Sequence, residues 1–296
     1  MRVLIAGASG FLGTHLSEHL RVHGHEVVHL VRRPAESPQE SQWDPAAGRV
    51  QPSVVEDADA VVNLAGASIA GNPHSKRWAR EVRDSRVDTT ALLAQTIAAC
   101  ERPPAFLAGN GISYYGDHGA YELTEDSESL GDALLTRVTR DWEAATEPAR
   151  DAGARVCVLR TAPVMDRGSS PLRQLRLLFS LGLGARLGDG EQYMPMISLR
   201  DWVGAVAFLL ESHDLSGPFN LCCPQTPTNS EFTRALASAL RRPAMLAAPT
   251  AVLRPALGRM APEILGSVRV RPAALERAGY DFEDEDVDDV LAAALA

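Results

Sequence analysis

The first residues able to do chemistry form a glycine-rich turn near the N-terminus. Gly7, Gly10 and Gly13 have the spacing G-x-x-G-x-x-G and directly follow the apolar run of residues 2–6. Such a turn lets a diphosphate approach the backbone closely, and the N–H groups that open the next helix point at its negative charge. The spacing predicts a dinucleotide site, with a plain ligand-free turn as the alternative. The residues expected to bind are Gly7, Ser9, Gly10, Phe11, Leu12 and Gly13.

Two arginines follow the second apolar run, residues 26–31, and bear on the type of dinucleotide. An NAD site carries an acidic residue about 20 residues beyond the glycines, where it accepts a hydrogen bond from the ribose 2′-hydroxyl. Arg32 and Arg33 stand there instead, and their guanidinium groups offer forked donors to a 2′-phosphate. The sequence therefore predicts NADP(H) as the cofactor, unless both arginines are ordinary surface residues.

Small residues end the third apolar run, where the sequence reads Asn63-Leu64-Ala65-Gly66. At that place they let the ribose or the diphosphate of a dinucleotide approach the edge of a sheet. Leu64, Ala65 and Gly66 are therefore further candidates for cofactor binding, although the motif alone predicts only a strand that ends in a turn.

These residues need a parallel sheet to position them, and the order of elements predicts one. Apolar runs alternate with helical stretches, the pattern of repeated strand–helix–strand units. It predicts an α/β fold, a doubly wound parallel-sheet Rossmann domain with right-handed crossovers. The expected strands are residues 2–6, 26–31, 60–65, 105–108 and 155–159, and the expected helices are residues 15–23, 75–100 and 132–150.

The sequence pattern changes after residue 165. Glycine-rich and proline-rich loops there separate further helical patterns at 199–211, 229–240 and 273–278. Residues 1–165 are expected to form the NADP-binding Rossmann domain, with residues 198–222 returning to it. Residues 166–197 and 223–296 are expected to form a smaller, mostly helical C-terminal lobe on the substrate side.

The composition argues against several classes of function. The 296 residues carry a net charge of −9, and no basic stripe suits nucleic acid. No run of 18 apolar residues predicts a membrane span, and the cysteines lack metal or redox spacing, so no metal site is predicted. Free cysteines without a leader favour a cytoplasmic protein. The seven carboxylates between residues 281 and 289 predict a solvated acidic segment before a last helix.

Besides the glycine turn, short motifs occur in a fixed order along nearly the whole chain. They are Trp43-Asp44-Pro45, Asn63-Leu64-Ala65-Gly66, Asp84-Ser85-Arg86-Val87, Tyr114-Tyr115-Gly116-Asp117, Asp141-Trp142-Glu143, Gly182-Leu183-Gly184, Gly188-Asp189-Gly190, Gly217-Pro218-Phe219-Asn220-Leu221 and Leu240-Arg241-Arg242-Pro243. In this order they resemble the extended short-chain dehydrogenase/reductase superfamily. The match is closer to an atypical branch of epimerase-family proteins, often labelled nucleoside-diphosphate-sugar epimerases and described as NADP-dependent oxidoreductases. The resemblance implies that Arg32, Arg33, Leu64, Ala65, Glu81 and Arg86 contact NADP.

The catalytic pair of most of this superfamily is absent. Its members use a Tyr-x-x-x-Lys pair, in which the tyrosine moves a proton and the lysine lowers the pKa of that tyrosine. Among the 29 basic residues only Lys76 is a lysine, and the residue four positions before it is Asn72. The atypical branch is similar in lacking the pair.

The remaining candidates for proton chemistry follow the strand expected at 105–108. The branch commonly has a serine where this chain has Asn110, and Ser113 is near but offset. Tyr115 or Tyr114 is the expected proton donor, with Asn110 or Ser113 polarising a carbonyl. The alternative is that both tyrosines only form the wall of a pocket.

The leading hypothesis is an NADP(H)-dependent oxidoreductase or epimerase-like enzyme that acts on a small carbonyl or sugar-type molecule. The alternative is an NADP-binding sensor or partner protein with vestigial catalysis, because the Tyr-x-x-x-Lys pair is missing. The expected partner is a small-molecule substrate, with neither nucleic acid nor membrane. Relatives often pair through long helices that flank the sheet, so the helix expected at residues 75–100 makes this chain a candidate homodimer.

Overall fold

The computed structural model describes residues 1–296, and its contacts divide the chain into two compact units. Unit 1 comprises residues 1–110, 138–159 and 206–218, and unit 2 comprises residues 111–137, 160–205 and 219–296. These boundaries differ from those expected from the sequence, chiefly because residues 111–137 group with C-terminal segments. One cause is the parallel pairing of β6 (Glu122–Leu123) with β13 (Arg269–Val270).

A seven-stranded sheet is the main element of the fold, and the expected doubly wound Rossmann fold is confirmed. The pairs β1–β2, β1–β4, β2–β3 and β4–β5 all run parallel. In spatial order the strands are β11 (Gly217–Leu221), β7 (Val156–Thr161), β5 (Ala105–Gly111), β4 (Ala60–Asn63), β1 (Arg2–Ala6), β2 (Glu26–Val31) and β3 (Glu40–Gln42).

The strand register sets up one functional edge in unit 1. Ala6 of β1 pairs with Asn63 of β4, and Asn63 pairs with Ala108 of β5. β1 and β4 therefore end at the same level, β5 continues to Gly111, and the segments that leave all three strands start at the same edge of the sheet. Ligands of open α/β sheets bind outside such carboxyl ends.

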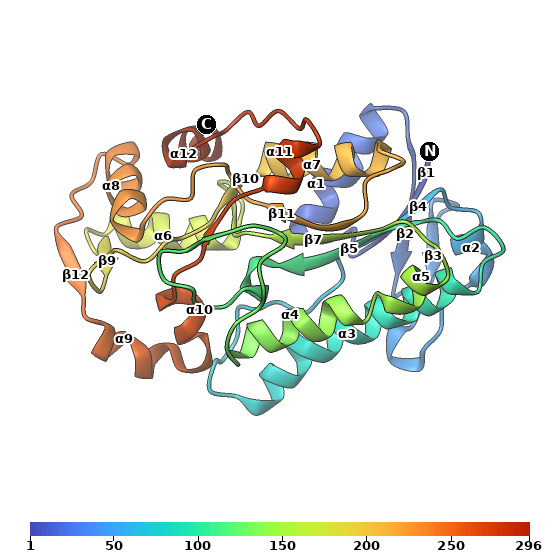
Figure 1. Cartoon of the computed structure of the whole chain (residues 1–296), viewed down its shortest axis with the longest axis horizontal. Helices are drawn as coiled ribbons and strands as arrows, with labels where there is room; N and C mark the ends of the chain where they lie inside the picture. The colour runs from blue at the N-terminus through green and yellow to red at the C-terminus, as the bar shows by residue number, and fades with distance from the viewer. The chain divides into compact units, whose positions relative to one another are not determined.

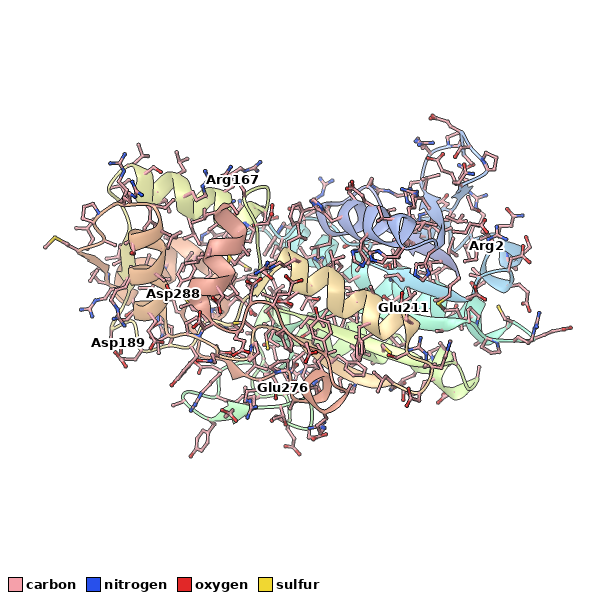
Figure 2. All side chains as sticks on the ribbon, turned by 90° about the horizontal axis from the view of Figure 1, so that it is seen from above. Arg2, Arg167, Asp189, Glu211, Glu276 and Asp288 are labelled. Atoms are coloured by element: carbon pink, nitrogen blue, oxygen red, sulfur yellow. The ribbon has the colours of Figure 1, made fainter.

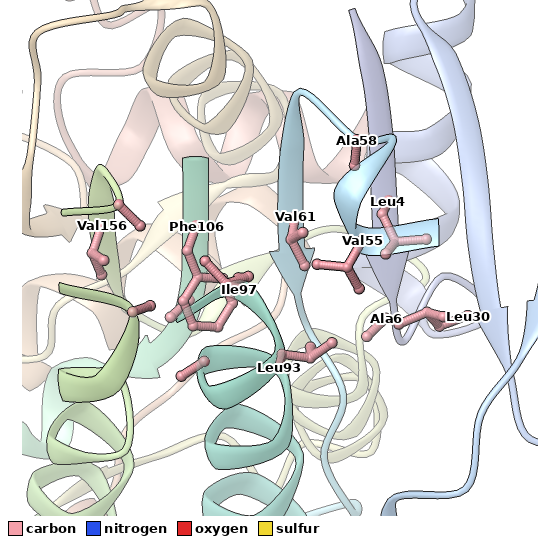
Figure 3. Close-up of a cluster of buried hydrophobic side chains, with 14 of the residues drawn as sticks. Leu4, Ala6, Leu30, Val55, Ala58, Val61, Leu93, Ile97, Phe106 and Val156 are labelled. Atoms are coloured by element: carbon pink, nitrogen blue, oxygen red, sulfur yellow. The ribbon is translucent and has the colours of Figure 1, made fainter. Parts of the chain in front are cut away.

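Helices cover both faces of these strands in unit 1. In Figure 1, α1 (Phe11–Val22) lies on the upper side, while α3 (Lys76–Ala98) and α5 (Glu147–Asp151) lie side by side on the lower side. Figure 3 shows the core between strands and α3, where Leu93 and Ile97 face Val61 and Phe106. The short α2 (Pro52–Glu56) adds Val55 to the same cluster.

The helix expected at residues 132–150 is two helices. The structure has α4 (Leu134–Ala144) and α5, separated at Thr146, whose Oγ1 donates to the Glu143 carbonyl at 2.7 Å. Pro148 stands in the first turn of α5, where proline is favoured because its missing N–H would have no partner there. Proline therefore marks the start of a second helix.

Unit 2 is mostly helical, with three small pairs of strands. Figures 1 and 2 show α8 and α12 side by side, and Figure 2 labels Asp288 on α12. The helices wholly within this unit are α6 (Ser170–Ser180), α8 (Asn229–Ala239), α9 (Thr250–Leu257), α10 (Ala261–Leu265), α11 (Ala273–Arg277) and α12 (Val287–Leu295), while α7 (Leu199–Glu211) has residues in both units. The strand pairs are β6–β13, β8–β10 (Val164–Met165 with Ile197–Ser198) and β9–β12 (Ala185–Leu187 with Leu246–Ala248).

The acidic segment is not uniformly solvated, so that expectation is wrong in part. The Asp284 side chain is buried and accepts a hydrogen bond from Arg200 Nε at 2.7 Å. Asp286 caps α12, because its Oδ1 accepts the backbone N–H groups of Asp288 and Asp289. Two of the seven carboxylates thus have structural roles, fixed by a guanidinium and by a helix N-terminus.

Candidate functional site

The glycine turn, residues 7–13, joins β1 to α1 in a conformation that depends on glycine. Gly7 has φ +80°, and a Cβ there would lie 2.6 Å from the carbonyl carbon of Leu64. A Cβ on Gly13 would lie 2.3 Å from the Gly7 carbonyl oxygen and 2.7 Å from Ala8 Cα. All three distances are too short for any side chain, so the turn requires close approach of backbone to backbone.

The same geometry brings two predicted cofactor segments together. The Gly7 backbone touches Leu64 and Ala65, which leave β4 at the functional edge. The buried Asn63 holds this exit, because its Oδ1 accepts the Ala65 N–H at 3.1 Å and its Nδ2 donates to Thr90 Oγ1 at 2.8 Å. Asn63 is thus a scaffold residue whose role the sequence motif did not reveal.

Exposure at the turn is uneven along its length. Ser9 and Gly10 are exposed, Phe11 and Leu12 are half-buried, and Gly13 is buried. The exposed positions at the N-terminus of the 12-residue α1 leave helix N–H groups accessible to an anion.

Arg86 on α3 lies beside the β4 exit with a guanidinium that no carboxylate contacts. Its Nη1 donates to the carbonyl oxygens of Ala67 at 3.0 Å and Val82 at 2.9 Å, and its Cζ lies 5.3 Å from the Trp142 ring centroid. A Cβ on Gly66 would lie 3.2 Å from Arg86 Cζ. Burial lowers the pKa of Arg86 to about 10, and no carboxylate acts in the opposite direction.

The two arginines after β2 differ in their partners. Arg33 makes a bidentate ion pair with Glu40, at 2.9 and 2.6 Å, and lies 3.5 Å from Glu36. Arg32 is exposed and makes no side-chain hydrogen bond or ion pair. The sequence predicted that both arginines bind a 2′-phosphate. In the structure only the guanidinium of Arg32 has all of its N–H donors available.

Two other candidates of unit 1 have less distinctive surroundings. Glu81 is exposed on α3 without a side-chain partner. Asn110 is 5% exposed, and its Nδ2 donates to the Thr139 carbonyl at 3.1 Å. A side chain committed in this way has a scaffold function that the sequence did not indicate.

The candidates of unit 2 follow β5 directly, and Tyr115 is the most enclosed of them. It is 0% exposed, its hydroxyl donates to Asn220 Oδ1 at 2.8 Å and accepts from Arg160 Nη1 at 2.9 Å. Burial, the largest cause, raises the pKa of Tyr115. The nearby Glu125 carboxyl is also buried and accepts the Asn220 and Ala274 N–H groups. This environment favours a structural role for Tyr115.

Tyr114 is half-buried, and its hydroxyl makes no hydrogen bond within the protein. The Arg160 guanidinium lies over its ring, with Cζ 3.6 Å from the centroid, a cation–π contact that fixes the ring plane. Its backbone carbonyl accepts a hydrogen bond from Ser129 Oγ. Of the two tyrosines, Tyr114 is the one whose hydroxyl is available to a ligand.

Ser113 has a partner that sequence reasoning missed. The Ser113 hydroxyl and the Leu135 N–H lie near the carboxyl of Glu263 on α10, about 150 positions later in the sequence, and both act to lower its pKa. Burial raises the pKa of Glu263, and its Oε1 is buried with no hydrogen-bond partner. No motif surrounds Glu263, so nothing in the sequence could have singled it out.

No group of three or more His, Cys, Asp or Glu side chains is arranged to hold a metal ion. None of the helices combines the length and the apolar character needed to cross a bilayer.

Comparison with known proteins places this geometry in a family. The model of the NAD dependent epimerase/dehydratase family matches residues 3–222, well over half of the chain. The chain belongs to this family. A second model, a domain of unknown function, matches residues 248–294, the part of unit 2 that contains Glu263.

Individual relatives confirm the resemblance to epimerase-family proteins that the sequence indicated. Epimerase family protein Mb2239 of Mycobacterium bovis is 40% identical over 290 residues, covering 98% of this chain and 96% of its own. The crystal structure of human epimerase family protein SDR39U1 (isoform 2) with NADPH has a TM-score of 0.89 at 33% identity and covers 99% of both chains. A nucleoside-diphosphate sugar epimerase of Corynebacterium glutamicum has a TM-score of 0.82 at 32% identity, covering all of this chain and 58% of that one.

Proposed function

We propose that the protein is an NADP(H)-dependent oxidoreductase or epimerase-like enzyme that acts on a small carbonyl or sugar-type substrate. The observation that carries the cofactor choice is Arg32, an exposed guanidinium without a partner that directly follows β2. A Rossmann site for NAD has an acidic side chain about there, whereas a free guanidinium matches a 2′-phosphate. The NADPH bound to the human relative supports the same choice.

The residues of unit 1 fit a dinucleotide in three respects. The glycine turn packs its backbone closely where no Cβ fits, and its exposed Ser9 and Gly10 open α1. Arg86 offers an uncompensated positive charge beside Gly66, which suits a diphosphate. In this proposal the turn and Arg86 hold the diphosphate, Arg32 holds the 2′-phosphate, and Leu64 and Ala65 line the approach.

The chemistry divides between the cofactor and the chain. When bound, the nicotinamide supplies or accepts the hydride. The chain must then hold or move the proton at the oxygen of the substrate, and Ser113 and Tyr114 are the hydroxyl groups we propose for that work. Tyr115 is assigned to the scaffold, because its hydroxyl already has both a donor and an acceptor.

The proposal is tested by titrating the purified protein with NADPH and NADH, followed by cofactor fluorescence and thermal shift. We expect micromolar binding of NADPH and at least tenfold weaker binding of NADH. A panel of carbonyl compounds and sugar nucleotides then measures NADPH oxidation. Absence of binding to either cofactor would overturn the proposal.

A second candidate function is an NADP-binding sensor or partner protein. The enclosed Tyr115 and the missing Tyr-x-x-x-Lys pair favour it, because the usual proton-transfer residues are absent. Tight NADPH binding without turnover on the whole panel would select this function over the enzyme.

A further inference from the structure

Trp142 on α4 makes two different contacts with the same face of α3, both within unit 1. Its indole Nε1 donates to Thr90 Oγ1 at 2.8 Å, and this hydroxyl oxygen also accepts Asn63 Nδ2 at 2.8 Å. Its ring lies beside Arg86, whose Cζ is 5.3 Å from the ring centroid. Arg86 and Thr90 are four positions apart, the spacing of neighbours on one helix face. Trp142 therefore joins a fixed hydroxyl to the guanidinium one turn earlier.

The half-buried guanidinium of Arg86 is held by neutral groups alone. Its Nη1 donates to the carbonyl oxygens of Ala67 and Val82, while Nε and Nη2 make no hydrogen bond within the protein. An aromatic face attracts a cation, and tryptophan does so most strongly. The ring of Trp142 is therefore the third group that fixes this guanidinium, and it leaves the N–H groups of Nε and Nη2 for an anionic ligand.

Two further features place the indole. Gly109 of β5 is buried, and a Cβ there would lie 3.2 Å from Trp142 Cζ2 and 2.7 Å from the Asn63 carbonyl oxygen. Glycine at this position gives the ring its space. Asp141, the neighbour of Trp142 on α4, accepts a hydrogen bond from Arg83 Nε at 2.8 Å and so ties α4 to α3. The position of the ring is therefore set by the fold of unit 1.

The segment that leaves β4 has anchors of its own. The Ala65 N–H donates to Asn63 Oδ1 at 3.1 Å, and the Ala67 N–H donates to Ser85 Oγ at 2.9 Å. Neither bond involves the indole. Loss of the Trp142 side chain therefore leaves this segment in place and acts first on the guanidinium of Arg86.

We propose that Trp142 is a positioning residue for the cofactor. Its bond to Thr90 fixes the plane of the ring, and the ring holds the Arg86 guanidinium where the diphosphate binds. The inference rests on the proposed function and deepens it, because it names the residue that prepares the anion site. Trp142 itself does not touch the cofactor. Its effect on binding should therefore be the same for NADPH and NADH, which share the diphosphate, and should vanish once Arg86 is removed.

The test is a double-mutant cycle on cofactor affinity. Fluorescence titration gives the dissociation constants of NADPH and NADH for the wild type, Trp142→Leu, Arg86→Ala and the double variant. We expect Trp142→Leu to weaken both cofactors about threefold to tenfold, the range of one cation–π contact. The double variant should bind no more weakly than Arg86→Ala alone. A tryptophan that served only stability would weaken binding in both backgrounds.

Two phenylalanine variants separate positioning from stability. Trp142→Phe keeps an aromatic face and loses the bond to Thr90, so its affinities should lie between those of the wild type and of Trp142→Leu. Trp202→Phe is the matched control, because the buried Trp202 donates from Nε1 to Thr161 Oγ1 at 3.2 Å in unit 2. It loses the same kind of hydrogen bond. We expect a lower unfolding temperature with both cofactor affinities unchanged.

The outcomes separate this role from the wider proposal. Wild-type affinities in Trp142→Leu, or in Trp142→Phe if the leucine variant does not fold, would overturn the positioning role and leave the proposed function standing. Equal weakening with and without Arg86 would also overturn it, since Trp142 would then act on the fold, and so would weakening of NADPH alone. A wild type that binds neither cofactor would overturn the proposed function and this inference together.

Discussion

The glycine turn and the buried polar group of Tyr115, Asn220 and Arg160 represent two ways of building local structure. The turn consists of contiguous residues and works through its backbone, so that a Cβ on Gly7 or Gly13 would meet main-chain atoms closer than 3 Å. The buried group joins Tyr115 to Arg160 and to Asn220, which is 105 positions later in the sequence, and works through side chains. A site of the first kind is visible in a sequence, and one of the second kind is visible only after folding.

The largest effect expected is at Gly13, the most crowded position of the turn. Gly13→Ala places a Cβ 2.3 Å from the Gly7 carbonyl oxygen, so the turn must open. We expect a stability loss of about 1–3 kcal/mol, typical of overpacking, and at least about 100-fold weaker NADPH binding. Thermal unfolding and fluorescence titration measure both.

Gly10→Ala is the matched control for this change, because its Cβ would meet only the Gly7 carbonyl oxygen at 3.2 Å. It should cost much less stability in thermal unfolding. Wild-type NADPH affinity in Gly13→Ala would show that the turn does not hold the cofactor.

The next prediction tests whether the Tyr115 hydroxyl stabilises the fold or takes part in catalysis. Tyr115→Phe removes the hydroxyl that links Asn220 and Arg160 and leaves buried polar groups without their partner. We expect a loss of about 1–3 kcal/mol in the free energy of unfolding, measured by urea denaturation. Turnover per folded molecule should stay near the wild-type value.

Tyr114→Phe is the counterpart of that variant. Its hydroxyl bonds nothing within the protein, so stability should hardly change while turnover falls. If turnover fell in Tyr115→Phe and stayed at the wild-type value in Tyr114→Phe, Tyr115 would be the proton donor.

Arg86 tests whether an uncompensated charge in unit 1 serves the cofactor. Arg86→Ala should weaken NADPH and NADH binding alike by about tenfold, or about 1.4 kcal/mol, because the diphosphate is common to both. Arg83→Ala, on the same helix and paired with Asp141, is the control and should leave both affinities unchanged. Equal behaviour of the two variants would remove Arg86 from the site.

The smallest effect expected concerns the pH dependence of stability through Glu263. Its pKa is raised in the folded protein, so between the unfolded and the folded pKa the native state binds more protons. Stability therefore falls as pH rises from about 4.5 through the raised pKa, and then levels off. Urea unfolding of wild type and Glu263→Gln at a series of pH values should show this fall in the wild type only.

The sequence predicted the fold well where the pattern was local. The strands at 2–6 and 26–31 and the helix at 199–211 have the expected bounds, since each is a regular apolar pattern between clear breaks. It did not predict α6, because Pro171 suggested a loop, whereas proline fits the first turn of a helix. The division of residues 111–137 from unit 1 depends on long-range pairing with residues 269–270, which no local pattern encodes.

For the candidate site, the sequence indicates segments more readily than it distinguishes individual side chains. Arg32 and Arg33 are equivalent in the sequence, but in the structure only Arg33 forms an ion pair with Glu40. Tyr114 and Tyr115 are neighbours in sequence, yet one hydroxyl is free and the other enclosed. These differences come from tertiary contacts, and so does the position of Glu263.

The cofactor preference of Arg32→Ala tests the central claim most directly. The ratio of NADH to NADPH dissociation constants is measured for the wild type, Arg32→Ala and Arg33→Ala at one salt concentration. The account predicts a wild-type ratio of at least about ten, a collapse toward one in Arg32→Ala through weaker NADPH binding alone, and a smaller change in Arg33→Ala. An Arg32→Ala variant that keeps the wild-type preference would contradict it.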